Sequence, residues 1–307
     1  MSGLFILPFF KKRNQSVGYD SKRPLLLLHI PKSAGSSLAD SINDAIHPQF
    51  PVIGGLDTIL FGAYDSFHEF SATEKLRIYV GENKLPVQAD YVTGHFSYNH
   101  LAAAYPHGQI ITIMREPTSR LISLWLFWRS HSDEQLAGLG SWGDVVKRAR
   151  APLRDFLKDP DIFCQTDNVA VRMLLSPHQR ITLNAPICSR DDIQLLRIAH
   201  DLLSRLSFVD VIENQQMSQS LEDWLGAPFK LSIRNVTIAT PVNFKSSLRR
   251  ELDDETLVLL EMRTRLDRVI WHTIVRRKQP KINSLSLERG AIMRMFSRAE
   301  RIIAGYE

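Results

Sequence analysis

Residues 29–37, His-Ile-Pro-Lys-Ser-Ala-Gly-Ser-Ser, combine one lysine, one glycine and three serines in a short stretch. Four leucines, Leu25–Leu28, precede this segment, and such a run is typical of a fully buried strand. A helix is expected to begin near Ser36 or Ser37, because either serine can cap it. A loop that joins a strand to a helix N-terminus directs free backbone N–H groups outward, so this segment could bind a phosphate or sulfate group.

Within this loop, Lys32 supplies a positive charge, and Gly35 lets the backbone approach a ligand closely. The serines add hydroxyl donors, so the candidate ligand-binding residues are Pro31, Lys32, Ser33, Ala34, Gly35, Ser36 and Ser37. The loop does not follow the P-loop pattern G-x-x-x-x-G-K-[ST], because its glycine comes after the lysine. The alternative interpretation is a tight turn with an exposed lysine.

A second buried strand is predicted at residues 109–114, and Arg115 follows it. Pro117 suits the first turn of the next helix. Doubly wound sheets bind ligands at the carboxyl ends of their strands, so Arg115, with Ser123 on that helix, is a candidate to bind a second phosphate. A structural salt bridge is the alternative for Arg115 and the preferred interpretation for Arg120.

The charge of Arg115 bears on the kind of nucleotide that could bind. A magnesium-dependent phosphoryl transferase would place a metal-binding carboxylate near the second strand end, whereas here Arg115 stands there with Glu116 beside it. This favours a ligand bound directly by cations. A nucleotide with phosphates at both its 5′ and 3′ positions fits the pattern.

These segments resemble the carbohydrate sulfotransferase superfamily, most closely its heparan 2-O-sulfotransferase-like and uronyl group and their bacterial relatives. His29–Leu38 resembles the family's 5′-phosphosulfate loop, H-I-P-K-T-[AG]-G-T-[ST]-L, and Arg115–Ser123 resembles its 3′-phosphate element, R-[DE]-P-x-x-R-x-x-S. Tyr91–Tyr98 resembles the segment that carries a catalytic histidine, which would be His95 here. The group can carry a second histidine two residues earlier, where this chain has Thr93.

The resemblance extends in organisation over most of the chain, with firm matches only in short stretches. Phe208–Leu225 resembles a later strand and helix of the family, and Arg234–Thr237, followed by a basic loop to Lys245, resembles the segment that closes over the nucleotide. The implied fold is α/β, a P-loop-NTPase-like parallel sheet flanked by helices. We expect this domain at residues 23–278, after a weakly ordered leader at 1–22 and before a basic tail at 279–307.

The implied function is transfer of a sulfuryl group from PAPS (3′-phosphoadenosine 5′-phosphosulfate) to a hydroxyl of a carbohydrate or glycoconjugate, with no metal expected. In this hypothesis Lys32 stabilises charge on the leaving oxygen, and His95 takes the acceptor's proton. Without the resemblance, a structural histidine is the preferred interpretation of His95, and His29 is interpreted as supporting the loop. A nucleotide-dependent kinase is the rival enzyme, and a non-catalytic glycan- or anion-binding relative is the rival outside catalysis. No nucleic-acid-binding motif is present beyond charge.

Other side chains have a functional and a structural interpretation each. Asp167, Asn168 and Arg172 could face an acceptor cleft, but a solvated helix face is the preferred interpretation. Trp125 and Trp128 could line a sugar site, although at helical spacing they are expected in the core.

The net charge of +5 suits an anionic ligand, a membrane surface or an acidic polymer without choosing among them. Cys164 and Cys188 have no metal-ligating neighbours at short spacing and indicate reduced thiols. The apolar run near the N-terminus is too short to span a bilayer and lacks the features of a signal peptide, so a cytoplasmic location is predicted.

The basic tail contains a predicted amphipathic helix. Its apolar face comprises Ile292, Phe296, Ala299 and Ile303, while Arg294, Arg298 and Arg301 lie elsewhere on it. The helix could contact an anionic membrane, pack on its own domain or join a second subunit in a homodimer, and the N-terminal segment could also touch a membrane.

Overall fold

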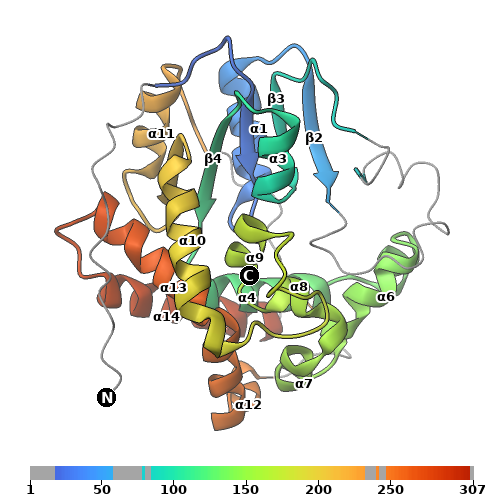
Figure 1. Cartoon of the computed structure of the whole chain (residues 1–307). Coiled ribbons are helices and arrows are strands. Elements are labelled where there is room, and N and C mark those ends of the chain that lie inside the picture. Colours follow the sequence, from blue (N-terminus) through green and yellow to red (C-terminus); the bar gives the residue numbers. More distant parts are fainter. Residues whose placement is uncertain (1–17, 58–77, 80–83, 232–239, 242–246, 305–307) are drawn as a thin grey trace.

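The computed structural model describes residues 18–57, 78–79, 84–231, 240–241 and 247–304 of the chain (Figure 1). Within these residues, five strands form one parallel sheet in the order β2-β3-β1-β4-β5. The strands are β1 (Leu25–Leu28), β2 (Pro51–Leu56), β3 (Tyr91–His95), β4 (Gln109–Met114) and β5 (Phe208–Val211). The expected parallel sheet flanked by helices is therefore confirmed, while the motif-bearing segment Arg234–Thr237 lies outside the described residues.

Helices follow or separate the strands along the described chain. The longer ones are α1 (Gly35–Ile46), α4 (Pro117–Arg129), α10 (Asp192–Arg205), α11 (Met217–Leu225), α13 (Asp254–Lys278) and α14 (Ser284–Ala304). The shorter ones are α3 (Tyr98–Ala104), α5 (Asp133–Ala137), α6 (Ser141–Lys147), α7 (Leu153–Lys158), α8 (Phe163–Thr166), α9 (Val169–Leu175) and α12 (Leu248–Glu251), with 3₁₀ turns at Arg148–Arg150, Pro160–Ile162 and Ser189–Asp191.

The leucines of β1 explain how the sheet is buried on both faces. Side chains alternate across a strand, so Leu26 and Leu28 pack with α3, α9, α10 and α13, whereas Leu25 and Leu27 pack with α1 and α11. All four are at most 1% exposed. Full burial of one leucine contributes about 1.5–3 kcal/mol, so this run anchors the centre of the sheet.

A second, helical layer lies at the carboxyl ends of the strands, toward which the strand arrows point in Figure 1. Its core is formed mainly by α4, α7 and α14, and it includes Trp125 and Trp128, which are 0% and 5% exposed. The two tryptophans therefore lie in the core, as their helical spacing predicted.

The predicted amphipathic helix near the C-terminus forms as α14 and packs against α4, α12 and α13. Its buried residues include Met295, Ala299 and Ile303, while Arg294 and Arg301 are exposed. In the described part of the chain, none of the helices combines the length with the low charge that a bilayer-spanning helix requires.

Strand β2 is not among the strands expected from the sequence, because Pro51, Gly54 and Gly55 are turn signals. Pro51 opens the strand, where a missing N–H is tolerated, and the strand lies at the edge of the described sheet. Gly55 pairs with Gly94 of β3, and the register shifts between Ile53 and Gly55. Such an irregular, largely exposed edge strand lacks the apolar run that identifies β1 and β4.

Candidate functional site

The loop between β1 and α1 is held in an uncommon backbone conformation. Lys32 and Ala34 have φ angles of 64° and 60°, in the left-handed region that costs about 1–2 kcal/mol for a residue other than glycine. The helix begins at Gly35 with Ala34 at the N-cap, and no side chain caps it. The expectation that Ser36 or Ser37 caps the helix is therefore wrong, and the N-terminal N–H groups of α1 are left without a side-chain cap.

The serines of this loop differ in exposure. Ser33 and Ser37 are buried, whereas Ser36 is exposed. The Ser33 hydroxyl is enclosed at 1% exposure and has no hydrogen-bond partner among the described residues. A buried hydroxyl without a partner costs about 1–3 kcal/mol, so this position is suited to a hydrogen bond with a bound ligand.

Gly35 is required by the packing of His29. A Cβ atom at this position would lie 1.7 Å from Cδ2 and Nε2 of the His29 ring, so any other residue here would force the His29 ring to move. The His29 ring also lies 4.5 Å, centroid to centroid, from the ring of His95. The His29 ring thus packs between the β1–α1 loop and the end of β3, in agreement with its interpretation as a loop-supporting residue.

His95 is the last residue of β3, and its ring is oriented by the β1–α1 loop. Its Nδ1 donates a hydrogen bond to the carbonyl oxygen of His29 at 3.1 Å. In a neutral imidazole this leaves Nε2 unprotonated, the form that a general base requires. Burial lowers the pKa of His95 to about 4, partly offset by this hydrogen bond, so the ring is neutral near pH 7.

Lys32 and Arg115 come together because β1 and β4 are parallel neighbours in the sheet. Nη1 of Arg115 donates to the carbonyl oxygen of Lys32 at 3.3 Å, and Nζ of Lys32 lies 3.7 Å from the ring centroid of Phe127 on α4. Burial lowers the pKa of Lys32 to about 8, with further lowering from the charges of Arg115 and Arg298. The described residues place no carboxylate within ion-pair distance of Lys32 or Arg115.

This geometry disfavours the salt-bridge alternative for Arg115. Burial lowers its pKa, and Glu213 offsets part of that effect without forming an ion pair. The other end of the guanidinium, Nη2, donates to the sulfur of Met295 on α14 at 3.2 Å. A guanidinium that has a carbonyl oxygen and a thioether as its contacts retains donors for an anion.

Glu116, next to Arg115, has a structural role. Its carboxylate caps α4 by accepting hydrogen bonds from the N–H groups of Thr118 at 2.9 Å and Ser119 at 2.7 Å. The N–H of Glu116 donates to Glu213 at 2.8 Å. Over the described ranges, the structure contains no group of three or more His, Cys, Asp or Glu side chains that could hold a metal ion.

Two other members of the arginine motif lie on α4. Arg120 is 2% exposed, and burial lowers its pKa to about 10 while the nearby charge of Asp267 opposes the shift. Its Nη2 donates to the carbonyl oxygen of Gln165 at 3.4 Å, whereas Nε and Nη1 are buried without a hydrogen-bond partner among the described residues. No described carboxylate forms an ion pair with Arg120, so the preferred interpretation as a structural salt bridge is not confirmed. Ser123 is half-buried, and no hydrogen bond in the described structure joins it to Arg115, so its phosphate contact stays a prediction.

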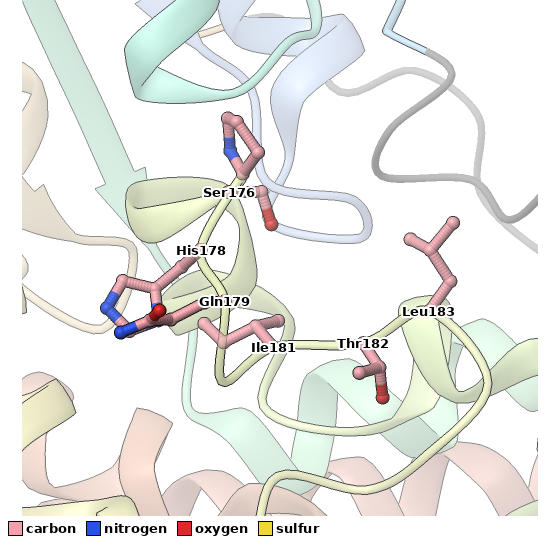
Figure 2. Close-up of a pocket in the computed structure, with 7 residues that line it drawn as sticks. Ser176, His178, Gln179, Ile181, Thr182 and Leu183 are labelled. Carbon is pink, nitrogen blue, oxygen red and sulfur yellow. The ribbon is translucent and has the colours of Figure 1, made fainter.

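A pocket of about 400 Å³ is lined by the loop that follows α9, with Ser176, His178, Gln179, Thr182 and neighbouring residues around it (Figure 2). The side-chain amide of Asn99, in the first turn of α3, donates to the carbonyl oxygen of Ser176 at 2.9 Å. Because α3 begins three residues after His95, this hydrogen bond holds the pocket loop near the end of β3.

A buried ion pair stabilises the same pocket-lining loop after α9. Arg172 and Asp167 are 2% and 0% exposed and lie 2.8 Å apart, Nη2 to Oδ2. Arg172 also donates to the carbonyl oxygens of Thr182 at 2.7 Å and Ala185 at 2.8 Å. The preferred interpretation of Asp167, Asn168 and Arg172 as a solvated helix face is therefore wrong, because helical spacing cannot distinguish an exposed face from a buried polar network.

Arg298 on α14 is the functional candidate that the sequence analysis missed. It is half-buried, and its charge contributes to the lowered pKa of both Lys32 and Arg115. The sequence places it in a basic tail far from both loops, and no spacing rule connects them. Only the packing of α14 on α4 brings it near the site.

No protein-family model matches this chain, and no curated protein sequence is significantly similar to it. The fold and the site together define an α/β protein whose parallel sheet carries a lysine and an arginine side by side at its carboxyl edge.

Proposed function

We propose that this chain is a sulfotransferase that transfers a sulfuryl group from PAPS to a hydroxyl group of a carbohydrate or glycoconjugate acceptor. The observation that carries the proposal is the meeting of Lys32 and Arg115, from adjacent strand ends, without a paired carboxylate among the described residues. Two like charges held together in a partly buried site disfavour the folded state until an anion binds between them. The buried Ser33 hydroxyl, which lacks a partner, supports the same interpretation.

In the proposed complex, the β1–α1 loop from Pro31 to Ser37 binds the 5′-phosphosulfate, and Arg115 and Ser123 bind the 3′-phosphate. This division follows the motif resemblance. It agrees with the positions of Lys32 and Arg115 in two different loops, which follow the adjacent strands β1 and β4. A nucleotide phosphorylated at both ends would engage both cations without a metal ion.

The proposed reaction is an in-line displacement at sulfur. The acceptor oxygen forms a new bond to sulfur, its proton passes to Nε2 of His95, and the bond from sulfur to the bridging oxygen of the 5′-phosphate breaks. The leaving group is 3′-phosphoadenosine 5′-phosphate, and Lys32 stabilises the charge that develops on its 5′-phosphate. The neutral state and the Nδ1–H tautomer of His95 support its role as base.

In this proposal the acceptor occupies the pocket beside Ser176. Its lining combines the apolar side chains of Pro177, Ile181 and Leu183 with hydroxyl, amide and imidazole groups, and no Asp, Glu, Lys or Arg side chain is among the lining residues. The polar groups can form hydrogen bonds with sugar hydroxyls, and the apolar ones can contact the faces of a sugar ring. The buried Arg172–Asp167 pair supports a preformed loop at this position.

A kinase remains the rival, and the role of Glu116 argues against it. Both carboxylate oxygens accept backbone hydrogen bonds at the N-terminus of α4, so this side chain is already engaged where a magnesium ligand would be needed. The kinase hypothesis would therefore need its metal ligands elsewhere.

Calorimetric titration with 3′-phosphoadenosine 5′-phosphate in EDTA tests the donor site, with ATP and 5′-AMP as controls. Selective, metal-independent binding is expected. Binding of ATP that requires magnesium would favour the kinase instead, and an absence of nucleotide binding would reject the assignment. Incubation with PAPS and a panel of saccharides then tests catalysis, because acceptor-dependent release of 3′-phosphoadenosine 5′-phosphate distinguishes an enzyme from a non-catalytic relative.

A further inference from the structure

The C-terminal helix α14 is fixed on the helical layer by an apolar face. Met295, Ala299 and Ile302 are at most 4% exposed and share a core with residues of α4. Because this face contacts α4 and α13, the rotation of the helix about its own axis is set by packing. The positions of its basic side chains are therefore determined by the fold.

The contact between Met295 and Arg115 places this helix at the candidate site. The Met295 sulfur lies 3.2 Å from Nη2 of Arg115. Residues three apart lie on neighbouring positions of a helix surface, so Arg298 lies one turn further along α14 from that contact. Phe127, over which the Lys32 ammonium lies, packs against the same core as Met295.

We infer that Arg298 is a third cationic ligand of the anion bound by Lys32 and Arg115, so that α14 forms one wall of the binding site. The ligand class is a multiply charged phosphate- or sulfate-containing anion. Its identification as the nucleotide 3′-phosphoadenosine 5′-phosphate, or PAPS, rests on the proposed function.

The electrostatics of the site agree with this placement. The charge of Arg298 lowers the pKa of Lys32 and of Arg115, so the three cations lie close enough to repel one another. No carboxylate of the described residues forms an ion pair with Arg298. A cation among other cations, with no acidic partner, is stabilised when an anion binds and neutralises the repulsion.

The same helix provides a matched control residue. Arg289 lies nine residues before Arg298, which at about 100° per residue places it on the opposite side of the helix. Arg289 is exposed and has no ion pair among the described residues. Substitution of either arginine by alanine removes one charge from α14 and leaves its apolar face intact.

The experiment is calorimetric titration of the full chain with 3′-phosphoadenosine 5′-phosphate and, separately, with inorganic pyrophosphate. The proteins are the wild type, Arg298→Ala, Arg298→Lys and Arg289→Ala, each checked for an unchanged fold by circular dichroism. We expect Arg298→Ala to weaken binding roughly tenfold to a hundredfold, the effect of losing one charge-assisted hydrogen bond. We expect Arg298→Lys to recover part of the loss and Arg289→Ala to bind within about twofold of the wild type.

The outcomes separate this inference from the proposed function. Unchanged nucleotide binding by Arg298→Ala would overturn the inference and leave the proposed function standing, and equal losses in Arg298→Ala and Arg289→Ala would overturn it as a general charge effect. If the wild type binds pyrophosphate but not the nucleotide, and Arg298→Ala alone weakens that binding, the inference holds while the proposed function fails. If the wild type binds neither anion, both are overturned.

Discussion

The charge on Lys32 is expected to destabilise the protein when no anion is bound. Burial and the neighbouring arginines lower its pKa from 10.5 to about 8. That difference corresponds to about 3 kcal/mol at about 1.4 kcal/mol per pKa unit. Replacement by methionine removes the charge and keeps much of the side-chain volume, but it loses the contact with Phe127, which contributes about 0.5–1 kcal/mol. Lys32→Met should therefore stabilise the unliganded protein by about 2–3 kcal/mol at pH 7.

The stability difference between Lys32→Met and the wild type should depend on pH. The unfolded chain retains the Lys32 proton up to a pKa near 10.5, whereas the folded chain releases it near 8. The folded state therefore becomes more stable as pH rises from about 8 to 10.5. Below pH 8 the full free-energy cost of keeping Lys32 charged in the folded state is present. The advantage of Lys32→Met should be largest at pH 7 and should shrink steadily toward pH 10.

Thermal and urea unfolding at several pH values between 7 and 10 measure this difference. For a chain of 307 residues, about 2 °C per kcal/mol predicts a rise in Tm of about 4–6 °C at pH 7. The matched control is Lys147→Met, because Lys147 is exposed, and it should change stability by less than about 0.5 kcal/mol at every pH. Equal or lower stability of Lys32→Met at pH 7, or a gain that does not shrink with pH, would refute the reasoning. The same variant should lose binding of 3′-phosphoadenosine 5′-phosphate.

Three further predictions concern the neighbouring groups. The pKa of His95 is about 4, so its protonation should not change kcat between pH 5.5 and 7.5. His95→Ala should lower kcat by about 10²-fold or more and leave nucleotide affinity unchanged. Parallel losses of kcat and nucleotide affinity would exclude a role as base. Gly35→Ala should destabilise the fold by about 1–3 kcal/mol and abolish anion binding, because the added Cβ would overlap the His29 ring. Unfolding and titration experiments measure both effects. The control is Gly290→Ala, whose added Cβ would contact only the flexible end of the Arg294 side chain. Arg172→Leu should cost about 3–5 kcal/mol in urea unfolding, since it removes the closer of the two arginines that pair with the buried Asp167 and leaves the carbonyl oxygens of Thr182 and Ala185 without their donor; a loss below about 1 kcal/mol would contradict the buried network.

The central strands and the two loops of the site could be predicted because their signals are local. The leucine run Leu25–Leu28 and the apolar run Gln109–Met114 are continuous, as expected of strands covered on both faces. The edge strand Pro51–Leu56 has no such run, and its exposed residues and glycines resemble a turn segment. Its identity as a strand depends on pairing with β3, which lies some forty residues later in the chain.

The polar residues of α9 and of the two positions before it show that a sequence pattern cannot predict whether a polar helix face is buried. Asn168 and Arg172 have the i,i+4 spacing of neighbours on one helix face, with Asp167 next to Asn168, and this pattern is compatible with either solvent exposure or burial. These side chains are buried because α13 packs against them, with Arg263 at 3.6 Å from Asp167, and because Arg172 donates to carbonyl oxygens of the following loop. Those contacts form only when distant segments pack together.

The sequence by itself determined the strand–loop–helix unit that carries Lys32 and Gly35, because a buried leucine run followed by a turn and a helix start is a local signal. It also placed Arg115 at a second strand end. Only the tertiary structure brought these residues together and added Arg298, since the parallel pairing of β1 with β4 and the packing of α14 on α4 depend on contacts between distant parts of the chain. The repulsion among these three cations, with which no carboxylate of the described residues forms an ion pair, is a property of that packing, and no spacing in the sequence encodes it.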